Sequence, residues 1–166
     1  MSNALYRTTG RELLKAIAAF QAGFHPAAVV LEGLTEETAR PHGLPHSIAD
    51  IVAHMCYWQD FFNRAAKDGY SGFSAHAGEG WPQATPGAWN DLRNKYLASV
   101  EETQQLAMTS PRLDEKLLPD GSPLWFWERE SLGSGLLHAA VHSSHHLGQV
   151  VTLRQLMGCG HPRREA

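Results

Sequence analysis

Three long stretches of the chain place apolar residues at helical spacing, and no stretch alternates apolar and polar residues over the length of a strand. The stretches cover residues 47–68, 88–108 and 131–157, and clusters of Pro and Gly separate them. Because period-2 alternation is the main signature of half-buried strands, its absence argues against a fold organised by a β-sheet. The sequence therefore predicts an all-α protein.

A fourth helical region is expected near the N-terminus. Thr8 to Ala22 carries apolar residues at helical spacing, and Gly23 interrupts the pattern. Pro26 suits the first turn of a renewed helix that reaches Leu34. The pattern leaves open whether this region is one kinked helix or two. Four amphipathic regions predict a four-helix bundle with long connecting loops, and we expect the 166 residues to form a single domain spanning 1–166.

Local signals fix several boundaries. Ser47 followed by Asp50 resembles a capping box and predicts the start of the second helix. Residues 70–87 are Gly-rich and show no periodicity, so we expect a long loop of the kind that often serves as a binding loop or lid. The later connection carries an aromatic cluster at residues 125–127, to which the pattern assigns no function.

Composition excludes several classes of function. Lys and Arg number 14 and Asp and Glu 17, giving a net charge of −3, so no basic face for a nucleic acid partner is expected. The 2 cysteines cannot form a disulfide scaffold, which favours a cytoplasmic location. We find neither a signal-peptide pattern nor 18 consecutive apolar residues, so no membrane association is expected.

Histidine is unusually frequent, with 10 residues in the chain. His142 and His146 lie four residues apart, within the arc of the last helix that we expect to face the core, at about 100° per residue. Residues four apart are neighbours on a helix surface, so both imidazoles can converge on one cation. The spacing matches the zincin HExxH motif, but Ser143 stands in place of its Glu, which argues against a protease of that class.

One helix cannot complete such a site, because ligands eight residues apart diverge by roughly 80°. His54 is the best third ligand, since it lies in the apolar arc of the second helix between Ile51 and Trp58. A lone histidine at such a position is more often a core residue than a ligand. A histidine in the apolar arc of one helix and an HxxxH pair on the inward face of another, which can face it, nevertheless favour a metal site. That site would be formed by His54, His142 and His146.

The other polar candidates carry weaker signals. His138, His145 and Gln149 could contact a ligand or a substrate, although a helix-flank or surface role accounts for each of them equally well. Cys56 points away from His54 and is expected to be a simple core or surface thiol. Solvated histidines are expected at loop and terminal positions, namely His42, His46, His76 and His161.

Two stretches, HSIADIVAHMCYWQDFF and HAAVHSSHHLGQVVTLRQLMG, resemble the DinB-like (damage-inducible) superfamily of metal-binding four-helix bundles. The first matches the family's second helix, with its histidine at His54. The second matches the HxxxH-x-x-Gln pattern of its last helix at His142, His146 and Gln149. The order of helices agrees over most of the chain, although the loop at residues 78–87 and the 125–127 segment have no counterpart with a known role.

The resemblance implies a divalent metal ion, zinc or nickel, held by the three histidines with water in the open positions. It also implies a homodimer, and an enzyme of the thiol S-transferase, hydrolase or isomerase type, related to bacillithiol- and mycothiol-dependent enzymes. The partners would then be a low-molecular-weight thiol and a small electrophilic substrate. The alternative is a non-catalytic metal-binding or stress-response protein. An ordinary imidazole pKa of about 6.5 predicts metal release below roughly pH 6.

Overall fold

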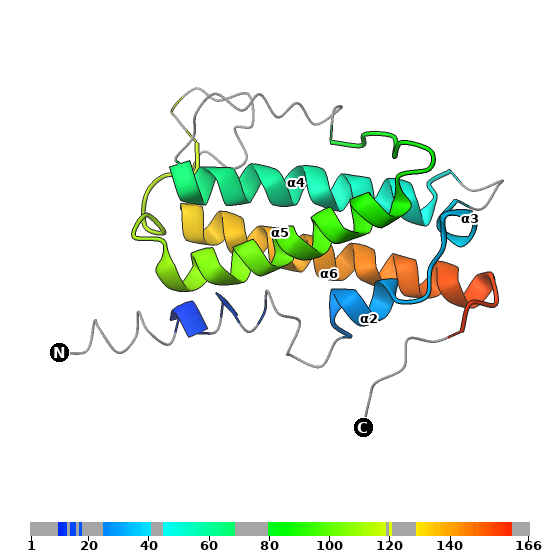
Figure 1. Cartoon of the computed structure of the whole chain (residues 1–166). Helices are drawn as coiled ribbons and strands as arrows, with labels where there is room; N and C mark the ends of the chain where they lie inside the picture. Colours follow the sequence, from blue (N-terminus) through cyan, green and yellow to red (C-terminus); the bar gives the residue numbers. More distant parts are fainter. Residues whose placement is uncertain are drawn as a thin grey trace.

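The computed structural model describes residues 10–12, 14, 15, 17, 25–40, 45–68, 80–118, 120 and 129–160. Three long helices pack side by side, α4 (Ile48–Asp68), α5 (Trp89–Thr109) and α6 (Leu132–Leu156), and two short ones, α2 (Ala27–Leu31) and α3 (Glu36–Ala39), lie near one end of them (Figure 1). Within these residues the β-structure amounts to one bridge between Lys116 and Ser131. The prediction of an all-α helical bundle is confirmed.

Helices α4 and α5 run in the same direction, and α6 runs opposite to both (Figure 1). In the first half of each helix, Cys56 of α4 lies beside the carbonyl of Leu92 of α5. Further toward their C-terminal ends, Lys67 of α4 pairs with Glu102 of α5, so residue numbers increase in the same direction along both helices. Parallel neighbours in a bundle need a crossover connection that returns the length of a helix. This requirement explains why a long connection, predicted from the sequence at residues 70–87, follows α4.

The predicted ends of the long helices are confirmed to within one residue. The Ser47 hydroxyl accepts the Asp50 amide at 3.1 Å, and the Asp50 carboxylate accepts the Ser47 amide at 3.0 Å, which is a complete capping box. Ser131 caps α6 by accepting the Ser134 amide. Gly158 ends α6 at φ 70°, a left-handed conformation that favours glycine.

The N-terminal region differs from the prediction. Helix α2 ends at Leu31 rather than Leu34, because Gly33 turns the chain at φ 70°. Helix α3 then follows, unpredicted, with a capping box between Thr35 and Thr38. Its Glu36 carboxylate accepts the backbone amides of Gly87 at 2.8 Å and Trp89 at 2.9 Å, so this short helix holds the start of α5.

The first predicted helix is separate from α2. The described residues among 10–17 are helical, whereas His25 and Pro26 are not, and Pro26 adopts extended torsion angles as the N-cap of α2. The Arg11 guanidinium donates to the carbonyls of Ala107 and Ser110 at the end of α5. The region therefore forms two pieces that pack against opposite ends of the bundle.

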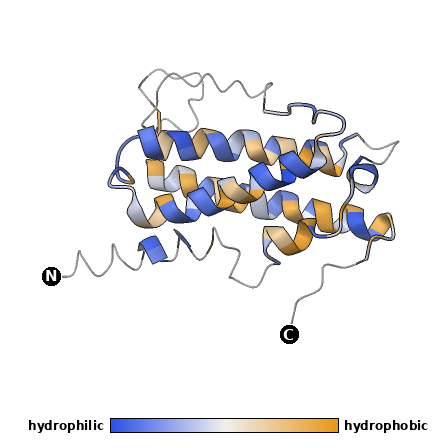
Figure 2. Cartoon of the chain, in the orientation of Figure 1, coloured by the Kyte–Doolittle hydropathy of each residue, from blue (hydrophilic) through white to orange (hydrophobic). Residues whose placement is uncertain are grey.

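The apolar core has two parts. One is centred on Val52, Tyr96 and Val150, and the other on Phe61, Phe62 and Leu136. Figure 2 shows the hydrophobic residues concentrated on α2 and along α6. None of the helices in the described segments has the length and apolarity needed to span a membrane. Between the two parts of the core lies a layer of polar side chains from α4, α5 and α6.

Candidate metal centre

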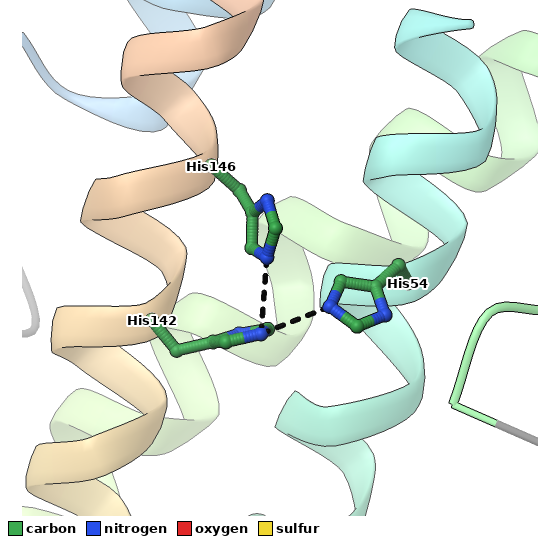
Figure 3. Close-up of side chains that lie close together, drawn as sticks. All are labelled: His54, His142 and His146. Carbon is green, nitrogen blue, oxygen red and sulfur yellow. Dashed lines mark hydrogen bonds between the residues drawn. The ribbon is translucent and has the colours of Figure 1, made fainter. Parts of the chain in front are cut away.

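His54 from α4 and His142 and His146 from α6 point toward one another across the interface between the two helices (Figure 3). The Nε2 atoms of His54 and His142 lie 2.9 Å apart, and those of His146 and His142 lie 3.1 Å apart. His54 and His146 are only 5% and 6% exposed, and His142 is half-buried. The structure thus brings together the three histidines predicted from the sequence.

Hydrogen bonds on the far side of two rings fix where their protons lie. His54 Nδ1 donates to the carbonyl oxygen of Gly80, which can only accept. His146 Nδ1 donates to Gln149 Oε1 at 2.8 Å, and Gln149 Nε2 in turn donates to His145 Nε2 at 3.3 Å. In their neutral forms, His54 and His146 therefore both direct an Nε2 lone pair at His142.

A proton on His142 Nε2 can satisfy only one of these two lone pairs. The other lone pair then faces, at about 3 Å, a nitrogen whose only hydrogen points elsewhere, and with the proton on His142 Nδ1 instead, both contacts join two unprotonated nitrogens. Either arrangement is unfavourable without a positive charge between the nitrogens. A divalent cation is such a charge, and imidazole nitrogens are among its usual ligands. The donor set and its protonation pattern therefore fit a metal ion.

The electrostatic environment keeps these rings neutral. Burial lowers the pKa of His54 to about 4, with a further contribution from the nearby His146 and an opposing one from the Gly80 carbonyl. Burial and the neighbouring histidines lower the pKa of His142 to about 3. Burial also lowers the pKa of His146, against the Gln149 hydrogen bond. Neutral imidazoles are the form that binds metals, so the site is ready for a cation at neutral pH.

The loop before α5 holds His54 from two sides. The indole of Trp81 stacks on the His54 imidazole, while the neighbouring Gly80 supplies the carbonyl to which His54 Nδ1 donates. A Cβ at Gly80 would lie 2.8 Å from the Trp58 ring, so only glycine allows this approach. On its other face Trp81 stacks on His46 at 4.3 Å between centroids. These four residues form what we call the loop clamp, namely His46, Trp58, Gly80 and Trp81.

A buried hydrogen-bond network lies beneath the histidines. The Ser143 hydroxyl donates to Gln59 Oε1 at 3.1 Å, linking α6 to α4. Gln59 Nε2 donates to the Thr103 hydroxyl, which donates to Asn63 Oδ1 at 2.7 Å, linking α4 to α5. Because Ser143 follows His142 directly, this network fixes the rotation of α6 relative to the helix that carries His54.

The weaker candidates separate into two groups. Gln149 contacts His146 as described, and His145 is exposed, accepts from Gln149 and meets the His146 ring edge-on at 5.0 Å between centroids. The His138 ring lies parallel to that of His142, with 6.0 Å between centroids, at the surface of α6. Cys56 is a buried core thiol, and burial raises its pKa to about 12, so it is unreactive.

The loop clamp is the part of the site that the sequence analysis missed. His46 was expected to be simply solvated, and it is exposed but stacked on Trp81. The only sequence signal was a Gly-Trp pair inside an unpatterned loop, and such a pair does not indicate which helix it contacts. Several other predictions lie outside the described residues, namely those for His42, His76, His161, residues 69–79 and residues 125–127.

Comparison with known proteins addresses the family directly. A family model of the DinB superfamily matches residues 9–150, which include His54, His142, His146 and Gln149. The chain belongs to the DinB superfamily. No curated protein and no solved structure matches the chain.

Membership of the DinB superfamily agrees with the chemistry of the histidine cluster. The superfamily is metal-binding, and in this DinB chain the three imidazoles form a group that could hold a metal ion. Within the described residues, that group contains no carboxylate or thiol. The match supports a metal-binding family, and the geometry identifies the three residues that could hold the ion.

Proposed function

We propose that this DinB-superfamily protein binds a divalent cation through His54, His142 and His146 and acts as a metal-dependent enzyme of the thiol S-transferase, hydrolase or isomerase type. The observation that supports the proposal most directly is the pair of Nε2 lone pairs directed at His142, since one shared proton cannot satisfy both. Zinc and nickel are the proposed metals, because both accept imidazole ligands.

Each residue of the site has a role in this proposal. The three imidazoles hold the cation without adding negative charge, so its full 2+ charge acts on whatever fills the remaining positions. When bound, the cation would lower the pKa of a coordinated water or thiol and supply a nucleophile at neutral pH. Gln149 orients His146, and the loop clamp orients His54 and covers one side of its ring.

One observation favours a second candidate, a non-catalytic metal-binding or stress-response protein. No carboxylate belongs to the histidine group within the described residues, so the site shows no committed general base. A thiol transferase can operate without one, because a metal-bound thiolate needs no further deprotonation. A hydrolase depends more strongly on such a base, which places it behind the transferase in this proposal.

The experiment combines metal analysis with turnover. The purified protein should contain close to one zinc or nickel ion per chain, and conjugation of bacillithiol or cysteine to the electrophile monochlorobimane should require both protein and metal. The His54→Ala variant should lose metal and turnover together, while His145→Ala should retain both. Full metal content without turnover for any thiol would favour the non-catalytic alternative, and absence of metal would contradict both.

We further propose that the protein forms a homodimer and that its co-substrate is a low-molecular-weight thiol. Both proposals rest on membership of the DinB superfamily. Light scattering at micromolar concentration tests the first, where a monomer mass would contradict it. The dependence of turnover on the added thiol tests the second.

A further inference from the structure

A pocket of about 470 Å³ opens beside α6, one helical turn before the histidine cluster. Its apolar wall consists of Phe62, Leu117, Leu137 and Val141. Its size falls in the range of pockets that bind small molecules, which is roughly 300–1,000 Å³. Nothing in the roles assigned above uses this space.

His138 lines the pocket and lies next to His142 of the proposed metal centre. Its imidazole lines the pocket and packs against Phe62 with 5.4 Å between ring centroids. The same ring also lies nearly parallel to that of His142, on the next turn of α6, with 6.0 Å between ring centroids and 18° between ring planes. Val141, which also lines the pocket, directly precedes His142 in the chain. A small molecule bound to the cation and extending along α6 toward its start would therefore pass His138 and reach the pocket.

The side chains around the pocket indicate what it would accept. Two aliphatic residues on α6 remain unusually exposed there, with Leu137 at 40% and Val141 at 57%. Such exposure on neighbouring turns of one helix is typical of a surface that binds apolar groups. Among the described residues that line the pocket, polar groups are few, and the one full charge is the Glu130 carboxylate. A ligand with a negative charge at this end would be repelled.

We propose that this pocket binds the apolar body of the substrate, an uncharged aromatic or branched aliphatic group, while the polar head of the same molecule binds the metal ion at His54, His142 and His146. The inference rests on the proposed function, because it assumes a cation at the three histidines. It adds a substrate class, namely small apolar molecules with one metal-binding oxygen or sulfur atom and no negative charge on the body.

The test uses two hydroxamates with the same metal-binding head and different bodies. Acetohydroxamate carries only a methyl group, and benzohydroxamate carries a phenyl ring. The full-length protein is loaded with cobalt, whose visible spectrum reports binding at the metal. We expect benzohydroxamate to bind at least about tenfold more tightly, because the phenyl ring would be removed from water. A benzohydroxamate with a para-carboxylate should lose this advantage, and Glu130→Gln should restore part of it.

Substitutions locate the effect. Val141→Trp fills the pocket and should remove the advantage of the phenyl ring while leaving acetohydroxamate binding unchanged. Leu156→Trp is the matched control, because Leu156 is a 77% exposed leucine at the other end of α6 and should keep the advantage. Equal binding of the two hydroxamates to the unaltered protein, or an advantage that survives Val141→Trp, would overturn the inference. Failure to bind cobalt at all would overturn the proposed function, and the inference with it.

Discussion

The indole of Trp81 lies almost flat on the imidazole of His54, with 3.7 Å between ring centroids and 12° between ring planes. Trp81 also meets His146 edge-on at 5.6 Å, although it is itself 39% exposed. A partly exposed tryptophan thus forms one wall of the proposed metal centre. Because it comes from a loop, the orientation of a ligand on a rigid helix depends on a segment outside the bundle.

The loop clamp is expected to determine metal affinity. Trp81→Ala removes the stack on His54 and should weaken zinc binding about 10-fold to 100-fold, the usual cost of losing a residue that orients a ligand. Trp81→Phe keeps an aromatic face and should recover most of the affinity. Gly80→Ala should weaken binding by at least as much as Trp81→Ala, since its Cβ would collide with Trp58.

Competition with a chromogenic chelator measures these affinities, and circular dichroism checks that each variant remains folded. Gly10→Ala provides a control for the mere loss of a glycine, because a Cβ at Gly10 would meet no atom within 4 Å. Unchanged zinc affinity in Trp81→Ala would contradict the role of the clamp.

Each of the three histidines is expected to be essential for metal retention. His54→Ala, His142→Ala and His146→Ala should each lose most of the bound metal, because two imidazoles hold a cation far less tightly than three. His145→Ala and His76→Ala should retain it. Elemental analysis after gel filtration gives the metal content, and a full complement in His54→Ala would show that the site does not involve both helices.

Gln149 should act through the protonation state of His146. Gln149→Leu leaves His146 Nδ1 without its acceptor and should weaken metal binding by about tenfold. Gln149→Glu supplies a carboxylate acceptor at the same place and should restore the affinity. Isothermal titration with zinc tests this, and identical behaviour of the Leu and Glu variants would indicate that the hydrogen bond has no influence on the site.

Acid should destabilise the metal-free protein. The pKa values of His54 and His142 are lowered to about 4 and about 3 in the folded state, against about 6.5 in the unfolded chain. At a pH between the folded-state and unfolded-state pKa values, the unfolded chain binds more protons than the folded protein. The free energy of unfolding therefore falls as the pH decreases from about 6.5. The same shifts move metal release to a more acidic pH than the value near 6 expected from an ordinary histidine.

Urea unfolding of the metal-free protein at pH 7.5 and pH 5 measures the effect. The double variant His54→Phe, His142→Phe should lose less stability over this interval than the unaltered protein, since it lacks the two groups responsible. Equal losses in both proteins would assign the acid sensitivity to other residues.

Arg154 is expected to stabilise the end of the bundle. The residue is 7% exposed, and its guanidinium donates to the carbonyls of Val30 at 2.9 Å and Glu32 at 2.6 Å, at the end of α2. Arg154→Gln should lower the free energy of unfolding by about 2 kcal/mol, because it leaves buried carbonyls without a donor. Arg64→Gln removes an exposed ion pair with Asp60 and should change stability by less than about 0.5 kcal/mol. Urea denaturation compares the two, and equal effects would contradict the role of Arg154.

The sequence predicted the parts of the molecule that follow from local periodicity. The bounds of α4 and α6 depend on Ser47, Ser131 and Gly158, whose caps act within a few residues. The convergence of His142 and His146 follows from helical geometry, and His54 was identified because it interrupts an apolar arc. These signals are contained in short segments, so the three-dimensional arrangement was not needed to recognise them.

The features that the sequence did not predict depend on contacts between distant segments. Trp81 and Gly80 meet His54 across 26 or 27 positions of the chain, and no periodicity links a loop to a helix face. The early end of α2 and the formation of α3 follow from Gly33 and from the bonds of Glu36 to the start of α5. The parallel orientation of α4 and α5 also has no local signature.

The hydrogen bonds among Ser143, Gln59, Thr103 and Asn63 have a consequence for the metal-free state. They hold α4, α5 and α6 at a fixed rotational phase, and none of them involves a histidine of the cluster. The geometry that receives the cation is thus encoded in the apoprotein, independently of the ligands that use it. Exchange of the three histidines for other side chains would then leave a rigid, preorganised scaffold on which a different metal chemistry could be installed.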